Sequence, residues 1–211
     1  IKHLHRLMVT SATYRQVSTH NEHAVRVDAQ NRLLWRMNPR RLDAESLRDA
    51  VLSVAGELNA QIGGKGYTDF NSYFFKGTQF YDPLDAADYS QQRRTVYRMW
   101  ARGGRSPFLD TFDCPDPSTT TPTRSATTTP LQALSLMNNA FMLRMSDRLA
   151  ARLVHDAGDD LSQQIDLAYR VAYGRRPALE EVPAVRAFAK RHGLPAMCRG
   201  LLNASEFLYV D

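Results

Sequence analysis

Three aspartates spaced three residues apart are the first candidates for chemistry in this sequence. Asp110, Asp113 and Asp116 lie at the start of a stretch rich in proline, serine and threonine. Carboxylates at close spacing can hold a hard cation such as Ca²⁺, although the alternating spacing and the glycine of an EF-hand loop are absent. Aspartates beside prolines also accept hydrogen bonds from backbone N–H groups in turns. We expect this structural role for the three acids.

A single arginine follows these acids. Arg124 lies among the serines and threonines of residues 118–129. An arginine beside hydroxyl groups and a helix N-terminus could hold an anion, because the N–H groups of the first turn and the helix dipole favour negative charge. The alternative, which we favour, is that Arg124 pairs with Asp113 or Asp116 and fixes the loop to the domain.

Neither cysteine has the sequence context of a catalytic or metal-binding thiol. Cys114 and Cys198 match no zinc or haem signature. We expect Cys198 to be a buried apolar filler, because it lies in a helical pattern. A disulfide between the two cysteines is possible in an oxidising compartment.

No other pattern specifies a reaction. No serine stands in a G-x-S-x-G setting, and phosphate-loop and dinucleotide fingerprints are absent. Glu206 and Asp211 could add a pair of carboxylates to the loop acids, but nothing in the sequence specifies it. We therefore expect no metal and no cofactor in this domain, and its catalytic residues stay unassigned.

The acidic stretch leads into a well-defined helix start. Thr129 is a plausible N-cap, Pro130 takes the first helical position, and Gln132 stands three residues after the cap. This is a capping box with proline at its preferred place. Apolar residues then recur at helical spacing, so we expect one long helix to about Val154. The threonines nearest the helix therefore have a structural role.

Helical patterns dominate the rest of the chain, with one exception. Helices are expected at residues 1–15, 28–38, 44–62, 160–173, 178–192 and from 195 onward. Residues 65–104 are aromatic-rich and glycine-punctuated, which indicates one or two short strands or an extended segment. Residues 88–100 within them could also begin helically. We expect a mainly α fold: a compact helical domain with a small β or extended insertion at about residues 65–104.

Composition supports one folded domain over residues 1–211. The hydrophobic share is 43% and the charged share is 23%, as in folded soluble proteins. No apolar run approaches the roughly 18 to 20 residues that span a bilayer. The sequence lacks an initiator methionine and opens in a helical pattern, so we expect a C-terminal fragment of a larger protein.

The excess of basic over acidic residues does not by itself indicate a nucleic-acid-binding function. The net charge is +5 and the pI is about 9.4, but the basic residues are scattered along the chain. The densest cluster comprises Arg93, Arg94, Arg98, Arg102 and Arg105. Because the basic residues are scattered and almost all are arginine, we expect no nucleic-acid partner.

Several stretches together resemble a known family. They are "LHRLMVTSATYRQ", "NRLLWRMNPRRLDAESLRDAVLSVAGELN", "RRTVYRMWAR", "LDTFDCPDPSTTTPTRSATTTPLQALSLMNN" and "LLNASEFLYVD". They are similar to the domain of unknown function 1553, which is common in planctomycetes. The resemblance spans nearly the whole chain, and the acidic loop with "TTTPLQAL" is its most specific part.

The resemblance implies a context rather than a reaction. In that family the domain lies near the C-terminus of large proteins that often carry a c-type cytochrome domain upstream, and sometimes a concanavalin-like carbohydrate-binding module. It implies an exported protein, periplasmic or at the cell surface, with any haem in another domain. It supplies no catalytic residues.

Two functional hypotheses follow. The first is a non-catalytic structural or interaction module of a large exported, cytochrome-c-linked protein, whose partners are other domains of that protein or another protein. The second is a hydrolase or a polysaccharide-processing or polysaccharide-binding domain, with its site at the Asp110–Arg124 loop. The first is favoured because no catalytic set converges in the sequence.

Overall fold

The computed structural model describes residues 1–85 and 87–210 and is mainly helical. The chain divides into two compact units, which are described separately. One comprises residues 1–41 with Tyr209 and Val210, and the other comprises residues 42–208. Among the described residues, no helix combines the length and apolar character that a bilayer crossing requires.

The smaller unit contains two short helices and a two-stranded ladder. These are α1 (Lys2–Thr10), α2 (Glu22–Val27), β1 (Arg40–Arg41) and β4 (Tyr209–Val210), with β1 and β4 antiparallel. Helix α2 begins after Asn21, whose side chain accepts a hydrogen bond from the backbone N–H of Ala24. An asparagine in this position is a favourable N-cap.

The expected helix over residues 28–38 is wrong, because these residues form turns. The carboxylate of Asp28 accepts the backbone N–H of Leu33 at 2.7 Å. The side-chain amide of Asn31 donates to the carbonyl of Arg36 at 2.8 Å. Short polar side chains that bond nearby backbone groups compete with helix formation, and here they prevail.

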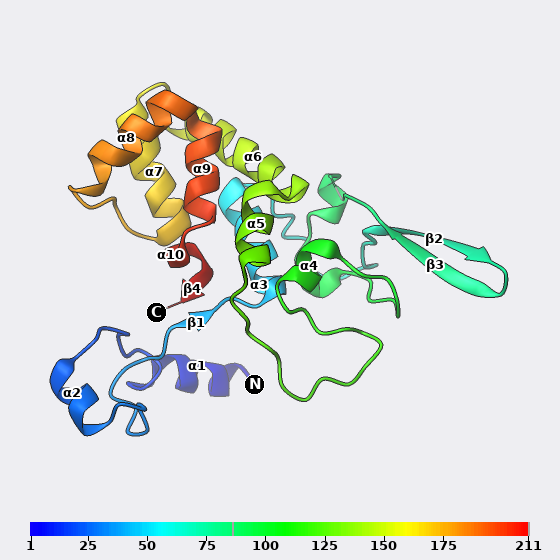
Figure 1. Cartoon of the computed structure of the whole chain (residues 1–211), viewed down its shortest axis with the longest axis horizontal. Coiled ribbons are helices and arrows are strands. Elements are labelled where there is room, and N and C mark those ends of the chain that lie inside the picture. Colours follow the sequence, from blue (N-terminus) through cyan, green and yellow to red (C-terminus); the bar gives the residue numbers. More distant parts are fainter. Residues whose placement is uncertain (86, 211) are drawn as a thin grey trace. The chain divides into compact units, whose positions relative to one another are not determined.

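The larger unit holds the hydrophobic core. Its helices are α3 (Ala44–Ala55), α4 (Pro107–Thr111), α5 (Pro130–Asn138), α6 (Ala140–Ala157), α7 (Leu161–Tyr173), α8 (Glu181–His192), α9 (Leu194–Leu202) and α10 (Ser205–Leu208). Helix α6 packs against α3, α5, α7 and α9 (Figure 1). Its side chains Met142, Met145, Leu149 and Leu153 are completely buried, so α6 is the element on which the others assemble.

The single long helix expected after Thr129 is two helices. Asn139 adopts an extended conformation, ends α5 and caps α6, and its side chain accepts the backbone N–H of Phe141 at 2.9 Å. The apolar periodicity runs through this break, so the pattern alone did not reveal it. The asparagine side chain replaces the backbone partner that a continuous helix would have supplied.

Other helix boundaries follow the expected capping chemistry. The carboxylate of Asp43 accepts the N–H of Ser46 and starts α3, and Asp160 starts α7. Gly174 ends α7 in the left-handed conformation, which glycine adopts at little cost. Helix α3 ends earlier than expected, at Gly56.

The segment at residues 65–104 contains one antiparallel hairpin. Strands β2 (Phe70–Phe75) and β3 (Thr78–Pro83) pair from Phe70↔Pro83 to Phe75↔Thr78. The turn between them has positive φ at Lys76 and Gly77, as the tight hairpin turn matched to strand twist requires. Residues 95–97 form a 3₁₀ turn rather than a strand or an α-helix.

Candidate functional site

The acidic loop is held from its middle by Asp113. The carboxylate of Asp113 accepts hydrogen bonds from the backbone N–H and the hydroxyl of Thr127, both at 2.8 Å. The side-chain amide of Gln132 donates to the same carboxylate at 3.3 Å. The backbone of Asp113 has φ +64°, a conformation that aspartate tolerates better than most residues. Asp113 therefore closes the loop on itself and on the start of α5.

Gln132 connects the loop to the core. Its side chain is buried, and it completes a capping box with Thr129, behind Pro130 at the first helical position. The same amide donates to the carbonyl of Thr111 at 3.0 Å and to the hydroxyl of Thr127 at 3.1 Å. The capping box predicted at Thr129–Gln132 is confirmed, and its glutamine also serves as the loop's anchor.

The other two aspartates share one cation, Arg105. Its Nε donates to Asp110 at 2.8 Å and its Nη1 donates to Asp116 at 3.1 Å. The hydrogen bond with Asp110 raises the pKa of Arg105. Asp116 also accepts the backbone N–H of Ser118 at 2.8 Å, and this bond lowers the pKa of the carboxyl. Asp110, Asp116 and Arg105 therefore close the first part of the loop.

Arg124 binds a different acid from the one expected. It donates a two-pronged pair of hydrogen bonds to Glu45, at 2.7 and 2.9 Å, and lies 3.6 Å from Asp43. The predicted pairing with Asp113 or Asp116 is wrong, because Asp113 binds Thr127 and Asp116 binds Arg105, while Arg124 reaches the first turn of α3. The hydrogen bond to Glu45 raises the pKa of Arg124.

A cleft of about 550 Å³ lies between this loop, the start of α3 and the 3₁₀ turn. Its lining combines charged, polar and apolar side chains; they are Asp43, Glu45, Ser46, Asp49, Arg94, Thr95, Val96, Trp100, Cys114, Pro115, Asp116, Pro117, Thr119, Thr121 and Arg124. Asp110 and Asp113 do not line it. Of the four site residues expected from the sequence, the structure therefore brings Asp116 and Arg124 to one cleft.

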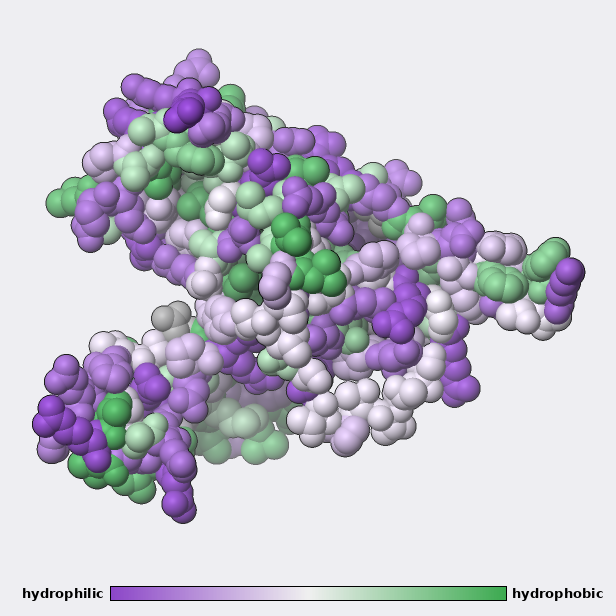
Figure 2. Space-filling model, in the orientation of Figure 1, coloured by the Kyte–Doolittle hydropathy of each residue, from purple (hydrophilic) through white to green (hydrophobic). Residues whose placement is uncertain are grey.

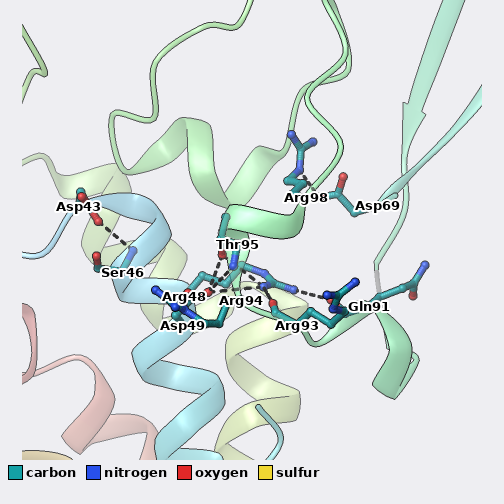
Figure 3. A network of polar contacts seen from close by, with 10 residues as sticks. All are labelled: Asp43, Ser46, Arg48, Asp49, Asp69, Gln91, Arg93, Arg94, Thr95 and Arg98. Atoms are coloured by element: carbon teal, nitrogen blue, oxygen red, sulfur yellow. Dashed lines mark hydrogen bonds and ion pairs between the residues drawn. The ribbon is translucent and has the colours of Figure 1, made fainter. Parts of the chain in front are cut away.

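A network of polar contacts joins α3 to residues 91–95 beside the cleft (Figure 3). The carboxylate of Asp49 accepts the backbone N–H and the hydroxyl of Thr95, both at 2.7 Å. Arg48 donates to the carbonyls of Arg93 and Gln91 at 3.0 and 2.9 Å. These bonds fix residues 91–95 against α3 and so position Asp49 and Thr95, which line the cleft.

Trp100 is the one exposed aromatic ring on the cleft's lining. The guanidinium carbon of Arg98 lies 4.7 Å from the centre of the Trp100 ring. Arg98 is itself buried, with its Nε 2.8 Å from Asp69 and an Nη donating to the carbonyl of Gly104 at 3.0 Å. The buried guanidinium of Arg98 therefore packs against the face of the Trp100 ring.

The arginine cluster of residues 93–105 is not a continuous basic surface. Arg93 and Arg98 are buried. The guanidinium of Arg93 donates to the carbonyls of residues 61, 63 and 65. Two of the five cations thus stabilise the backbone instead of facing a partner.

Both cysteines are free thiols. Burial, followed by the charge of Glu45, raises the pKa of Cys114 to about 12. Burial likewise raises the pKa of Cys198 to about 12. Cys198 is completely buried among core side chains, which confirms it as an apolar filler. A protonated Cys114 is a poor nucleophile, because the thiolate is the reactive form.

The acids near the end of the chain do not join the loop acids. Glu206 binds Arg175 through two hydrogen bonds, and Arg175 also binds Glu181. Asp211 lies outside the described residues. Within the described parts of the chain, no group of three or more His, Cys, Asp or Glu side chains is placed to hold a metal ion.

Sequence reasoning missed the partners of the expected residues. Arg105 stands five residues before Asp110, and this spacing could have suggested a local ion pair. Glu45 follows the cap of α3, where an acid near a helix start is ordinary. Trp100 and Asp49 carried no signal, because their places on the cleft depend on long-range packing.

The fold and the site define a mainly helical domain whose acidic loop is hydrogen-bonded to its own helices. A family model described as PSD1, protein of unknown function (DUF1553), matches residues 1–189. The chain belongs to this family. Neither the curated proteins nor the solved structures contain a match.

Proposed function

We propose that this domain is a non-catalytic structural or interaction module of a large exported protein that also carries a c-type cytochrome domain. The observation that carries the proposal is the engagement of Asp113 with Thr127 and Gln132. A carboxylate that accepts several hydrogen bonds within its own loop is committed to holding that loop. The description of the family to which the chain belongs names no activity.

The remaining chemical groups of the loop support the same reading. Asp110 and Asp116 share Arg105, and Arg124 pairs with Glu45. Cys114 has a raised pKa. No general base, nucleophile and acid are aligned by these contacts, as a catalytic site would need. Partners would be other domains of the same protein or another protein.

The exported, cytochrome-linked setting rests on the family resemblance alone. Haem, if present, would lie in another domain of the full-length protein. Fractionation of cells that express the full-length protein, followed by haem staining of the purified product, tests this setting. A cytosolic product without covalent haem would remove it.

A second function has one observation in its favour. The cleft joins an exposed indole, Trp100, with the carboxylates of Asp49 and Asp116. Aromatic faces and polar groups at one concave surface can bind a polysaccharide segment, since the ring covers apolar C–H surfaces and the carboxylates accept hydroxyl hydrogen bonds. In that case the loop would form part of a saccharide-binding surface in addition to stabilising the domain.

Variants of Asp113 and Trp100 separate the two functions. Asp113→Gly keeps the left-handed backbone and removes the carboxylate, so we expect the free energy of unfolding to fall by about 1–3 kcal/mol. Asp113→Asn, the matched control, keeps one acceptor oxygen and should lose less. Urea denaturation measures both, and calorimetric titration with oligosaccharides measures binding to the wild type and to Trp100→Ala.

The structural role predicts that Asp113→Gly is less stable than the wild type and that the wild type binds no oligosaccharide. If the wild type binds an oligosaccharide and Trp100→Ala abolishes that binding with the fold intact, the polysaccharide function replaces the first proposal. An Asp113→Gly variant as stable as the wild type would remove the observation on which the first proposal depends.

A further inference from the structure

The β2–β3 hairpin carries aromatic side chains that the domain does not cover. Tyr73, Phe74, Phe75 and Phe80 are 48, 70, 55 and 40% exposed. The hairpin extends away from the helices of its own unit (Figure 1), and hydrophobic atoms gather toward its end (Figure 2). A two-stranded hairpin in water has little stability of its own, so an uncovered aromatic end requires an explanation.

The base of the hairpin is anchored in the domain. Phe70 is buried and contacts Tyr81 edge to face, with ring centres 5.2 Å apart. A Cβ on Gly104 would lie 3.2 Å from the Phe70 ring, which shows how closely the backbone approaches it. The apolar residues beyond the base are therefore not needed to attach the hairpin.

The exposed rings occupy both faces of the hairpin. Tyr73 pairs with Phe80, and their rings stack with centres 5.5 Å apart. Phe75 shares this face, because side chains alternate along a strand. Phe74 lies on the opposite face and is the most exposed of the four. A flat partner that packed on one face would leave the other face in water.

The end of the hairpin carries a single charged residue. Lys76, in the turn, is the sole charged residue between Phe70 and Tyr81, and the next acid is Asp82 near the base. The ammonium of Lys76 lies 5.2 Å from the centre of the Phe75 ring. The aromatic end therefore carries one positive charge and no negative charge, which complements an anionic surface.

We propose that the end of the hairpin, residues 73–80, inserts into the interfacial region of an anionic lipid bilayer. Aromatic rings are favoured at the headgroup level of membranes. A medium that surrounds the end on all sides accounts for rings on both faces. Lysine near an anionic leaflet adds electrostatic attraction, and its long stem lets the ammonium stay among the headgroups while Phe75 goes deeper.

The geometry also limits the depth of insertion. Within residues 1–85 and 87–210, no further strand pairs with β2 or β3, so both strands have an open edge with unpaired N–H and C=O groups. Open sheet edges are excluded from the hydrocarbon core, where nothing satisfies them. The hairpin is therefore a shallow anchor and not a spanning element, and it acts independently of the function proposed for the cleft.

Sedimentation with vesicles tests this inference. The complete 211-residue chain is mixed with phosphatidylglycerol–phosphatidylcholine vesicles and with pure phosphatidylcholine vesicles. We expect binding to the anionic vesicles and weaker binding to the neutral ones. Phe74→Ser with Phe75→Ser should lower the partition coefficient by about tenfold or more, since two exposed rings are lost. Lys76→Glu should abolish the preference for anionic vesicles.

The matched control removes exposed apolar residues elsewhere in the same unit. Leu131 and Leu134 on α5 are also exposed, and Leu131→Ser with Leu134→Ser should leave vesicle binding unchanged. Circular dichroism confirms that each variant is folded. The inference is wrong if the wild type does not bind anionic vesicles, or if the α5 control loses as much binding as the hairpin variant. It is also wrong if the hairpin variant instead abolishes self-association in sedimentation velocity while no lipid binding is seen.

Discussion

The acidic loop and the aromatic hairpin leave the same helical core but treat their side chains in opposite ways. The loop directs its acids to partners within the unit: Asp113 to Thr127, and Asp110 and Asp116 to Arg105. The hairpin leaves its rings in water beyond an anchored base. The acids, which look reactive in the sequence, are thus hydrogen-bonded within the unit. The aromatic residues of the hairpin, which have the composition of a hydrophobic core, are exposed to solvent.

This difference shows where the free energy of each segment comes from. A polar loop needs internal hydrogen bonds, because a buried polar group without a partner costs more free energy than a formed hydrogen bond contributes. The hairpin gains little from its exposed rings in the isolated domain. The loop therefore stabilises the domain, and the hairpin end has surface available for something outside it.

The largest expected effect concerns the thiol of Cys114, which lies within the loop. Burial raises the pKa of Cys114 to about 12, so at pH 8 the thiol is almost entirely protonated. Alkylation by iodoacetamide should be slow in the native protein and should accelerate in Asp113→Gly, where the loop opens more often. Peptide mass spectrometry measures the rate, with buried Cys198 as the internal control.

The comparison fails if native Cys114 reacts as fast as a small free thiol. Such a rate would mean that the sulfur is accessible and that the acids of the loop do not hold the loop closed. Equal acceleration at Cys198 would indicate global unfolding instead of local opening.

A smaller effect is expected at the loop's anchor. Gln132→Ala removes the amide that binds Thr111, Asp113 and Thr127, and should lower the free energy of unfolding by about 2 kcal/mol. Leu131→Ala, one residue earlier and exposed, should change it by about 0.5 kcal/mol or less. Urea denaturation of both variants gives the difference, and equal values would contradict the anchoring role.

Local features of the loop could be read from the sequence, because their partners are near neighbours. The capping box at Thr129 and Gln132 is a fixed short-range pattern, and the structure contains it. The same holds for Asp43 at the start of α3. The mainly helical character also follows from periodicity, because α6 and α9 bury one face each.

Long-range partners could not be read in this way. Arg124 binds Glu45, which is 79 positions away, and no local spacing distinguishes it from Asp113 or Asp116. The break at Asn139 was hidden because the apolar residues of α5 and α6 keep one period across it. The cleft exists only once α3, the 3₁₀ turn and the loop are packed together, so Trp100 and Asp49 gave no sequence signal.

The smallest expected effect tests the other half of the comparison. Phe74→Ala should change the free energy of unfolding by about 0.5 kcal/mol or less, because the ring is 70% exposed and makes no core contact. Phe70→Ala, four residues earlier on the same face, should lower it by about 3 kcal/mol, because that ring is buried against Tyr81 and Gly104. Urea denaturation in the absence of lipid measures both. If Phe74→Ala were as destabilising as Phe70→Ala, the ring would belong to the domain's own packing, and its exposure would no longer point to an external surface.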